Sequence, residues 1–324
     1  KFTSFFLADY EEEESAAGVK MVTQDHEGRT WGITEYKIFV WDSTGMPILD
    51  LYKSINSRFQ PTRNKLFSIF CDEQNRIWLG SQAGLFLLDS ASRRFQLLPL
   101  IHPELIRTPI ITAFHQLSRD KLLISTAGNG IIELTWKNLI KNWSSAPWLK
   151  SNSTFNWIHQ TGTGRLFANQ YGERLLVLNN STDRVVLKEI EHKIEYAGLV
   201  EDFKRKRLWI PSANGLFYIE LDDPRYELQR DEYLDVKSIQ GLAVDSLGML
   251  WLSTSNGIAR YNPDLDTLEL RTYDIADGLQ GLEFNFAAIS KGRSGNLVFG
   301  GMNGVTIINP NDINDIKTPA RPFI

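Results

Sequence analysis

Short stretches of alternating apolar and polar residues recur along this chain at a nearly constant interval. Residues 71–86 and 244–259 align almost without gaps, and each stretch carries a Trp with a turn residue before it and a glycine after it. A large apolar anchor takes the same place in every copy, at spacings of 42 to 47 residues. The anchors are Trp31, Trp78, Leu123, Phe167, Trp209, Trp251 and Val298. Such a fixed period indicates a repeat architecture.

Two turn signals frame each anchor. Gly, Asn and Asp accept the positive φ of tight hairpin turns, and residues of this kind dominate the position three residues before the anchor. These are Gly28, Asn75, Asp120, Gly164, Lys206, Gly248 and Gly295. A glycine follows six of the anchors after five to seven residues, at Gly84, Gly130, Gly172, Gly215, Gly257 and Gly304, whereas the first repeat has Lys37 there. Each anchor strand is therefore expected between two turns.

Each repeat predicts four short antiparallel strands, as in residues 240–244, 249–253, 257–261 and 268–273. Four strands every 40 to 50 residues form one blade of a propeller. Seven anchors predict an all-β, seven-bladed β-propeller that occupies residues 1–324 as one domain. The blades are expected near residues 18–52, 65–99, 110–143, 154–190, 196–230, 238–275 and 284–308.

The seventh blade lacks an outer strand of its own. After residues 305–308 the chain runs into Pro310, Pro319 and Pro322, which disfavour a further strand. The apolar segment 2–7 precedes the first blade and has no partner there. We expect it to supply the fourth strand of blade seven, so that the ring closes without an unpaired edge.

Composition narrows the functions that fit. The chain has 324 residues and a net charge of −4, so nothing favours binding to nucleic acid, which requires a basic face. The single Cys71 cannot form an internal disulfide and is expected to be an inert core residue. No run of eighteen apolar residues is present, and the first residues resemble the interior of a longer protein. We expect the chain to be a piece of such a protein.

A search for catalytic or metal-binding motifs favours a binding domain over an enzyme. The five histidines, at positions 26, 102, 115, 159 and 192, show no metal-ligand spacing. Asp25 precedes Gly28 by two intervening residues and is expected to cap its own hairpin turn. The run Glu11 to Glu14 is interpreted as a solvated loop. No catalytic residue, metal or cofactor is predicted.

Four tryptophans break the repeat near the junction of blades three and four: Trp136, Trp143, Trp148 and Trp157. They either fill the space beside the small anchor Leu123 or form an exposed platform for a sugar ring or a partner protein. Trp148 follows Pro147 in the loop that is expected to join two blades, so it is expected to be the most exposed of the four. Trp41 aligns with core positions and is expected to be buried.

Ligands of propellers bind at the ends of the central channel, on loops held by the rigid blades. The longer inter-blade loops are expected at residues 53–65, 100–109, 147–156 and 276–285. Their candidate binding residues are Arg58, Arg63, His102, Arg107, Trp148, Asn156, Gln280 and Asn285. The loops between middle strands add Tyr36, Tyr171, Asn214, Asn256 and Asn303, although an Asn before Gly also suits a turn.

The repeat resembles that of the two-component regulator propeller family. Residues 72–85 and 245–258 carry its pattern of Asp, turn residue, Trp and glycine, and residues 25–31 carry the first half. Residues 277–285, Asp-Gly-Leu-Gln-Gly-Leu-Glu-Phe-Asn, resemble the last propeller blade before the membrane-proximal sandwich of these receptors. Blades three, four and seven depart from the pattern in lacking the anchor Trp.

The resemblance implies a periplasmic sensor domain of an inner-membrane receptor whose missing output domain is a kinase or a cyclase. It implies a small-molecule ligand, often an oligosaccharide, and as partners the other sensor domains of the receptor and a homodimer mate. Membrane contact would come only from segments outside this chain. Two other functions stay open: a propeller lyase or glycosidase, and a structural or protein-docking propeller without a ligand.

Overall fold

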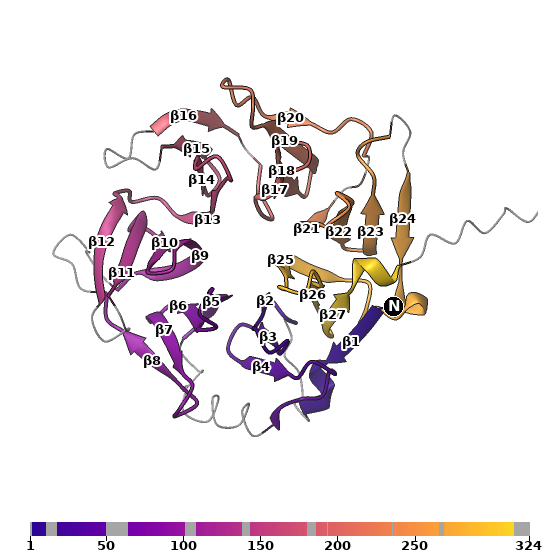
Figure 1. Ribbon diagram of the computed structural model, residues 1–324, viewed down its shortest axis with the longest axis horizontal. Coiled ribbons are helices and arrows are strands. Elements are labelled where there is room, and N and C mark those ends of the chain that lie inside the picture. The colour runs from indigo at the N-terminus through magenta and orange to yellow at the C-terminus, as the bar shows by residue number, and fades with distance from the viewer. Residues whose placement is uncertain are drawn as a thin grey trace, which may run out of the picture.

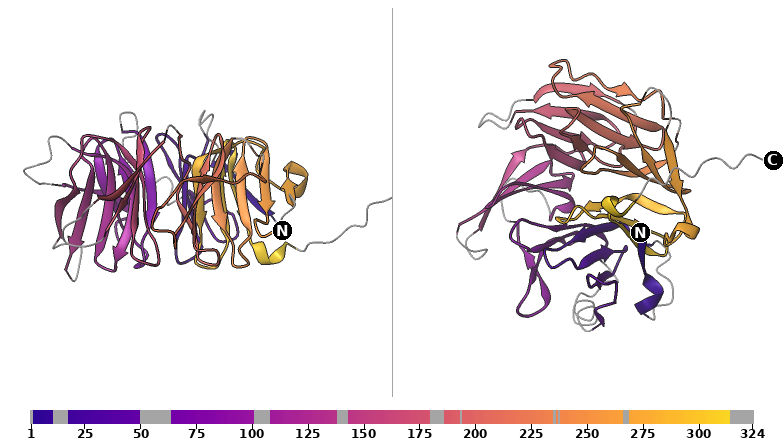
Figure 2. Two further views of the ribbon diagram at one scale, coloured as in Figure 1. Left: turned by 90° about the horizontal axis from the view of Figure 1, so that it is seen from above. Right: turned by 45° about the vertical axis from the view of Figure 1, so that its right-hand side comes forward.

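Seven small sheets stand around a central channel in the computed structural model of the chain (Figure 1). The structure describes residues 2–10, 18–49, 64–100, 108–137, 143–179, 186–192, 194–234, 236, 238–265 and 269–313. Seen from the edge, the ring is a flat disc (Figure 2). The predicted seven-bladed propeller is confirmed.

Every blade runs outward from the channel in sequence order, except that blade seven takes its outer strand from the N-terminus. The inner strands are β2 (Met21–Gln24), β5 (Leu66–Cys71), β9 (Ile110–Ser118), β13 (Phe155–Gln160), β17 (Val200–Asp202), β21 (Ile239–Val244) and β25 (Phe284–Lys291). The second strands are β3 (Thr30–Ile33), β6 (Ile77–Ser81), β10 (Lys121–Ala127), β14 (Leu166–Gln170), β18 (Arg207–Ser212), β22 (Leu250–Thr254) and β26 (Leu297–Gly301).

The outer half of each blade consists of its third and fourth strands. The third strands are β4 (Ile38–Trp41), β7 (Gly84–Asp89), β11 (Ile131–Trp136), β15 (Arg174–Leu178), β19 (Gly215–Glu220), β23 (Gly257–Tyr261) and β27 (Gly304–Ile308). The outer strands are β8 (Arg94–Leu98), β12 (Trp143–Leu149), β16 (Val186–Glu191), β20 (Gln229–Arg230), β24 (Leu270–Tyr273) and β1 (Phe2–Phe6). Within the described residues, the 3-10 helices η1 (Leu7–Tyr10), η3 (Ile275–Asp277) and η4 (Pro310–Asp312) lie outside the sheets.

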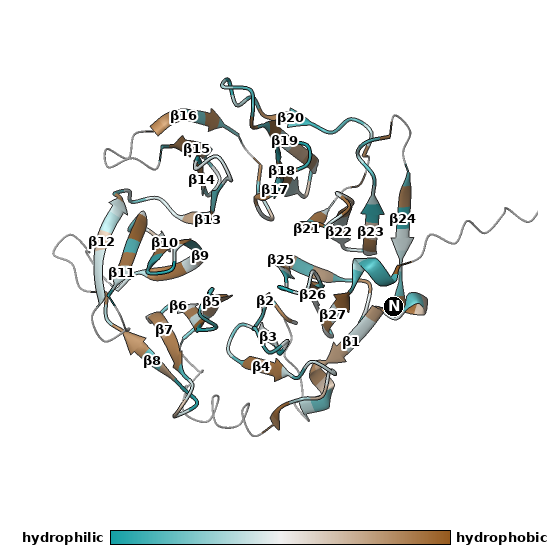
Figure 3. Cartoon of the chain, in the orientation of Figure 1, coloured by the Kyte–Doolittle hydropathy of each residue, from teal (hydrophilic) through white to brown (hydrophobic). Residues whose placement is uncertain are grey.

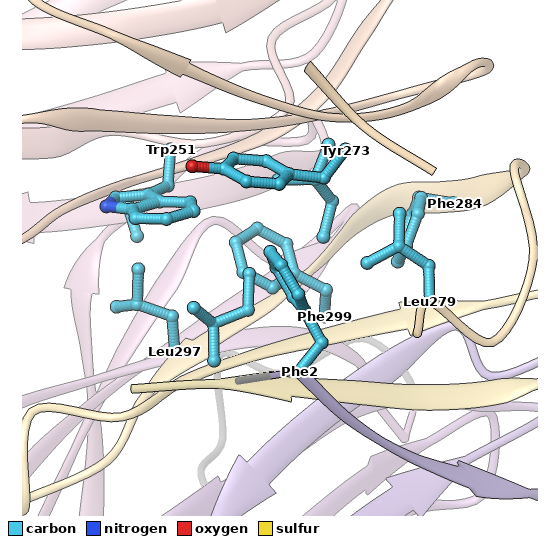
Figure 4. Close-up of a cluster of buried hydrophobic side chains, with 10 residues drawn as sticks. Phe2, Trp251, Tyr273, Leu279, Phe284, Leu297 and Phe299 are labelled. Carbon is cyan, nitrogen blue, oxygen red and sulfur yellow. The ribbon is translucent and has the colours of Figure 1, made fainter. Parts of the chain in front are cut away.

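The ring closes through blade seven, as predicted. Strand β1 pairs antiparallel with β27, from Phe2 opposite Ile308 to Phe6 opposite Gly304. Phe2 packs among Trp251, Tyr273 and Phe299 between blades six and seven (Figure 4), and only 8% of it is exposed. Both ends of the described chain therefore belong to one sheet, and the apolar side chains of β1 help to bury its neighbours.

The repeat anchors form the cores between blades. All seven anchor side chains are at most 1% exposed, and Trp41 is fully buried as expected. Apolar residues concentrate within the strands and polar ones in the connections (Figure 3). Six of the seven turn residues before the anchors have positive φ, as do all six glycines after them. Only Asp120 departs, because blade three closes this hairpin by a tighter turn in which Lys121 pairs with Ser118.

Four blades share a further feature, here called the Asp–Trp clasp: a buried Asp in the first turn accepts a hydrogen bond from the indole N–H of the anchor. In blade six, the carboxylate of Asp245 accepts from the backbone N–H of Leu247 and Met249, each at 2.9 Å, and from Trp251 Nε1 at 2.9 Å. The predicted turn-capping role of Asp25 is thus confirmed and extended. The clasps are Asp25–Trp31, Asp72–Trp78, Asp202–Trp209 and Asp245–Trp251.

Two blades differ from the expected layout, blade one in the number of its described strands and blade three in where it ends. The sheet of blade one has three strands within the described residues, and the place of its outer strand falls partly in residues 50–63, which the structure does not describe. Blade three was expected to end near residue 143, but its outer strand β12 begins there and includes Pro147. An outermost strand tolerates proline because one of its edges needs no hydrogen-bonded partner.

Neighbouring blades are tied together on the face where the first and second strands join. At each step from blade one to blade seven, a side chain of one blade bonds to a backbone group of its neighbour. The bonds are His26 N to Asn75 Oδ1, Glu73 N to Gln116 Oε1, Gln160 N to His115 Nε2, Gly162 N to Glu201, Arg205 Nη1 to Gly248 O and Lys291 Nζ to Val244 O. These bonds hold the inner strands at fixed positions around the channel.

Candidate ligand site: the two mouths of the central channel

Two cavities occupy the central channel, one at each mouth. The loop-side pocket, of about 430 Å³, lies where the inner strands begin. The turn-side pocket, of about 640 Å³, lies where they end in the first hairpin turns. Trp157 and Ala287 line both pockets, so these two residues form a shared wall. Both volumes suit a small-molecule ligand.

The loop-side pocket combines aromatic rings with amide and charged groups. Five blades contribute to it. Its lining residues are Lys20, Met21, Glu35, Lys65, Leu66, Phe67, Thr112, Asn156, Trp157, Asn285, Phe286 and Ala287. Phe67 is 37% exposed, which leaves much of its ring free to contact a ligand. Rings that offer an apolar face beside amides that offer donors and acceptors suit a polyhydroxylated molecule.

A charged network borders this pocket. The carboxylate of Glu35 bonds to the ammonium of Lys65, and the Nζ of Lys20 lies 3.7 Å from it. The hydrogen bond from Lys65, helped by the charge of Lys20 and a hydrogen bond from Tyr36, lowers the pKa of Glu35 below its usual value. Tyr36, a residue chosen from sequence, is thus linked to the mouth of the channel through Glu35.

Blade seven reaches into the channel through an irregular inner strand. In β25, Phe284 pairs with Gly301 and Ile289 with Phe299, so three more residues separate the pairs on β25 than on β26. Within this bulge Ala287 has a φ of 63°, a left-handed conformation that is unfavourable for a residue with a Cβ. The bulge places Phe286 and Ala287 in the pocket lining. Bulges often redirect side chains toward functional sites.

The turn-side pocket is more apolar. Leu199, Ala243 and Ile289 contribute to its walls, and Phe203 and Lys204 come from the blade-five turn at its rim. Phe203 is 74% exposed.

Three residues form a polar chain across blades three, four and five beside this pocket. His115 Nε2 accepts a hydrogen bond from Gln160 N at 3.2 Å, and the rings of His115 and His159 lie 5.8 Å apart. His159 Nε2 lies 3.2 Å from Glu201 Oε2. Burial lowers the pKa of His115 to about 4, and the nearby His159 adds to this effect. His115 is therefore neutral at neutral pH.

Sequence reasoning missed His115 and His159 as channel residues. Each lies opposite the anchor of its own blade, His115 opposite Leu123 and His159 opposite Phe167. Their separation of 44 residues equals the separation of those two anchors. That shared repeat position was the available signal that the two side chains meet in neighbouring blades.

The structure brings together two of the loop residues chosen from sequence, Asn156 and Asn285, which line the same loop-side pocket. Asn285 Nδ2 also donates to Val19 O at 2.9 Å and so connects blades seven and one. Tyr171 is 47% exposed and its hydroxyl bonds to Glu195, but it lines neither pocket. Four of the chosen residues lie outside the described part of the chain: Arg58, Arg63, His102 and Arg107.

The remaining residues chosen from sequence lie in turns or in the interior of the described structure. Gln280 is 4% exposed, and its Oε1 accepts from the backbone N–H of Asn303 at 2.8 Å. The side-chain Nδ2 of Asn303 in turn donates to Gln280 O. Asn214 and Asn256 donate their backbone N–H groups to the hydroxyl two residues earlier, as turn residues do.

The expectation that Trp148 is exposed is wrong. Trp148 lies on β12 and is 4% exposed, packed with the anchor Leu123 between blades three and four. The larger ring fills the space that the small anchor leaves. Trp136 is also buried, against Trp78, with ring centroids 5.7 Å apart. Of the four tryptophans that break the repeat, Trp157 is the one that reaches both channel pockets.

Cys71 is half-buried rather than a full core residue, and burial raises the pKa of its thiol to about 12. An un-ionised thiol is a poor nucleophile. Among the described residues, no three His, Cys, Asp or Glu side chains are grouped closely enough to hold a metal ion. In the same part of the chain, no helix has the length and apolar character needed to cross a membrane.

Comparison with known proteins gives one local sequence match. No protein-family model matches the chain. A stretch of 79 residues is 33% identical to "Histidine kinase P4" of Formosa agariphila, which corresponds to 24% of this chain and 6% of that protein. The chain thus spans a small part of its curated relative.

Solved structures match nearly the whole chain. The extracellular domain of the hybrid two-component system BT3049 of B. thetaiotaomicron superposes with a TM-score of 0.74 at 19% identity, covering 96% of this chain and 41% of that one. The corresponding domain of BT4673 gives 0.72 at 18%, covering 97% and 40%. The propeller fold is shared with these extracellular domains. A streptogramin B lyase gives 0.68 at 13%, covering 95% and 97%.

The solved extracellular domains are more than twice as long as this chain, which spans about 41% of the BT3049 domain and about 40% of the BT4673 domain. At such identities the likeness establishes the fold and leaves the activity to be argued from the site. The lyase shows that a propeller of nearly the same extent also occurs in an enzyme.

Proposed function

We propose that this chain is a ligand-sensing propeller of a membrane-bound two-component receptor, placed in the periplasm, and that its loop-side pocket binds a carbohydrate. Two findings support the placement: the fold shared with extracellular domains of two-component systems and the local match to a histidine kinase. The other domains of the receptor and a second copy of it are the expected partners.

One observation carries the choice of site: aromatic rings and amides from three blades meet at the loop-side mouth. Phe67 and Trp157 offer apolar faces, and Asn156 and Asn285 offer amide groups. Flat rings pack on the apolar faces of sugars, while amides and charged groups bond to the hydroxyls. The Lys20–Glu35–Lys65 network adds charged donors and an acceptor at the rim.

A ligand can act as a signal only if it binds two states of the receptor with different affinity. Blade seven is in a position to transmit such an effect. Its inner strand β25 lines the pocket, and its outer strand β1, at the other edge of the same sheet, is the N-terminal strand of the described chain. Ligand contact with the β25 bulge would then act on the sheet that holds the ring closed.

A thermal-shift screen against mono- and oligosaccharides, followed by calorimetry on each hit, tests this function. We expect a stabilising sugar whose affinity falls at least about tenfold, or 1.4 kcal/mol, in Phe67→Ala and in Asn156→Ala. Tyr171→Ala is the matched control, since this exposed aromatic lies outside both pockets.

Three outcomes would contradict the proposal. Turnover of a bound sugar would indicate an enzyme instead of a receptor. The absence of any sugar response would favour a structural or protein-docking propeller. An equal loss of affinity in Tyr171→Ala and Phe67→Ala would place the ligand elsewhere.

A further inference from the structure

The turn-side mouth carries an aromatic side chain that is not part of the neighbouring hydrophobic cores. Phe203 is 74% exposed, yet it lies at the rim of an apolar cavity. Its ring rests against the backbone of the neighbouring blade, because a Cβ placed on Gly162 would lie 3.0 Å from Phe203 Cε1. Covering a large exposed aromatic side chain beside an apolar cavity removes apolar surface from water, so this feature indicates a binding surface.

The cavity behind Phe203 can enclose a compact ring. Its volume of about 640 Å³ falls within the range of small-molecule sites. Leu199, Ala243 and Ile289 provide apolar walls, and Trp157 separates the cavity from the loop-side pocket. A flat apolar molecule would therefore gain contact with aromatic and aliphatic surfaces together.

The polar groups of this pocket are better suited to accept a hydrogen bond than to donate one. Glu201, whose side chain is 6% exposed, accepts from Gly162 N with both carboxylate oxygens at 3.0 Å. His159 is 24% exposed, and its Nε2 lies 3.2 Å from Glu201 Oε2; in the tautomer whose Nε2–H donates to this carboxylate, Nδ1 is an acceptor. A ligand that brings its own donor would match this arrangement.

The two lysines of the pocket are already engaged. Lys204 Nζ lies 2.8 Å from Asp264 Oδ2, and Lys291 Nζ donates to Val244 O at 2.8 Å. An anionic ligand would also meet the carboxylates of Glu201, Asp202 and Asp245, which line the same pocket. The pocket therefore favours a neutral molecule.

We propose that the turn-side pocket is a second binding site, which takes a compact neutral aromatic molecule carrying a hydrogen-bond donor such as a phenol hydroxyl or an indole N–H. The ring lies against Phe203, and the donor bonds to His159. This inference goes beyond the proposed sensing of carbohydrate and does not depend on it, because the two pockets have different linings apart from Trp157 and Ala287.

Saturation-transfer NMR and calorimetry with phenol and indole test the site directly. We expect binding with a Kd at or below about 1 mM, and weaker binding of toluene, which has a similar ring but no donor. Phe203→Ala should weaken indole binding at least about tenfold. Two matched controls should leave it unchanged: Leu247→Ala, an exposed side chain that is not in the lining, and Phe67→Ala, which lines only the loop-side pocket.

His159→Phe tests the polar half of the proposal. We expect it to remove the preference of the pocket for phenol over toluene, with its melting temperature recorded to show that the ring remains folded. No binding of phenol or indole at millimolar concentration would overturn the proposal. So would a loss in Phe67→Ala as large as in Phe203→Ala, or an unchanged preference in His159→Phe.

Discussion

Four blades of this propeller hold an Asp–Trp clasp and three do not, and the two kinds of blade differ in the inner-strand residue that lies opposite the anchor. On the inner strand opposite the anchor, the clasped blades carry Thr23, Phe70, Val200 and Ala243. At the same position the unclasped blades three, four and seven carry His115, His159 and Ser290.

The difference has a physical basis. The indole N–H of a buried Trp needs an acceptor, and the clasp supplies it together with a cap for the first turn. Leu123, Phe167 and Val298 bring no such donor, so their blades can dispense with the buried Asp. The clasped blades thus hold their anchors through a buried polar contact, while blade seven carries the long bulge of β25 and blades three and four carry His115 and His159.

The largest expected effect concerns the clasp itself. Asp245→Ala leaves three donors without their acceptor, among them the buried indole N–H of Trp251, and should cost roughly 4 kcal/mol of unfolding free energy. Thr161→Ala, in the first turn of unclasped blade four, is the matched change and should cost about 1 kcal/mol. Urea unfolding measures both variants, and similar losses would remove the distinction between the two kinds of blade.

The closing strand offers the next test, because blade seven has a strand from each end of the chain. Phe5 is 3% exposed and its neighbour Phe6 is 40% exposed. Phe5→Ala should lower the unfolding free energy by about 3 kcal/mol, and Phe6→Ala by less than about 1 kcal/mol. If Phe5→Ala were as mild as Phe6→Ala, β1 would not be holding the ring closed.

His115, in blade three without a clasp, should make the unfolding free energy depend on pH. The pKa of His115 is about 4 in the folded protein, whereas it is about 6.5 in the unfolded chain. As the pH falls from 6.5 to 4, the unfolded state takes up the proton first, so up to about 3 kcal/mol of stability is lost.

Urea unfolding at pH 7 and at pH 4.5 measures this loss. His115→Gln should lose less stability than the wild type between the two values, because the titrating group is gone. His26→Gln, an exposed histidine of clasped blade one, is the control and should behave as the wild type. A wild-type pH dependence in His115→Gln would contradict the assignment.

The smallest effect concerns the bulge of blade seven. Ala287→Gly should raise the unfolding free energy by up to about 1 kcal/mol, because glycine adopts the left-handed conformation without steric cost. Ala288→Gly, one residue further along the same strand, should instead lower it by a similar amount. Thermal unfolding of the pair measures the opposite signs, and equal signs would refute strain at Ala287.

The arrangement of the blades could be predicted from sequence because the same pattern of anchors and turn residues recurs from blade to blade. The anchor spacing predicted seven blades, and the glycine following Trp78 or Trp251 predicted a turn that the structure has. The N-terminal strand was predictable because an apolar segment and an incomplete blade each lacked a partner. These are local patterns, and each one is set by the chemistry of a few adjacent residues.

The channel was harder to predict because it is made by deviations from the repeat. The β25 bulge has no periodic signal, and its residues Phe286 and Ala287 were not chosen as site residues. Trp148 was misjudged because Pro147 was taken to mark a loop, whereas an outer strand accepts a proline. Asn156 and Asn285 were chosen correctly as loop residues, but their meeting across the ring follows only from the closed fold.

Hydrogen–deuterium exchange of the protein with a stabilising carbohydrate tests the central claim most directly. We predict slower exchange where the inner strands begin at the loop-side mouth, in residues 65–67, 156–157 and 285–287, and little change near Tyr171. Protection confined to the outer strands, or to the loops around Tyr171 and Asn256, would contradict a ligand site in the channel.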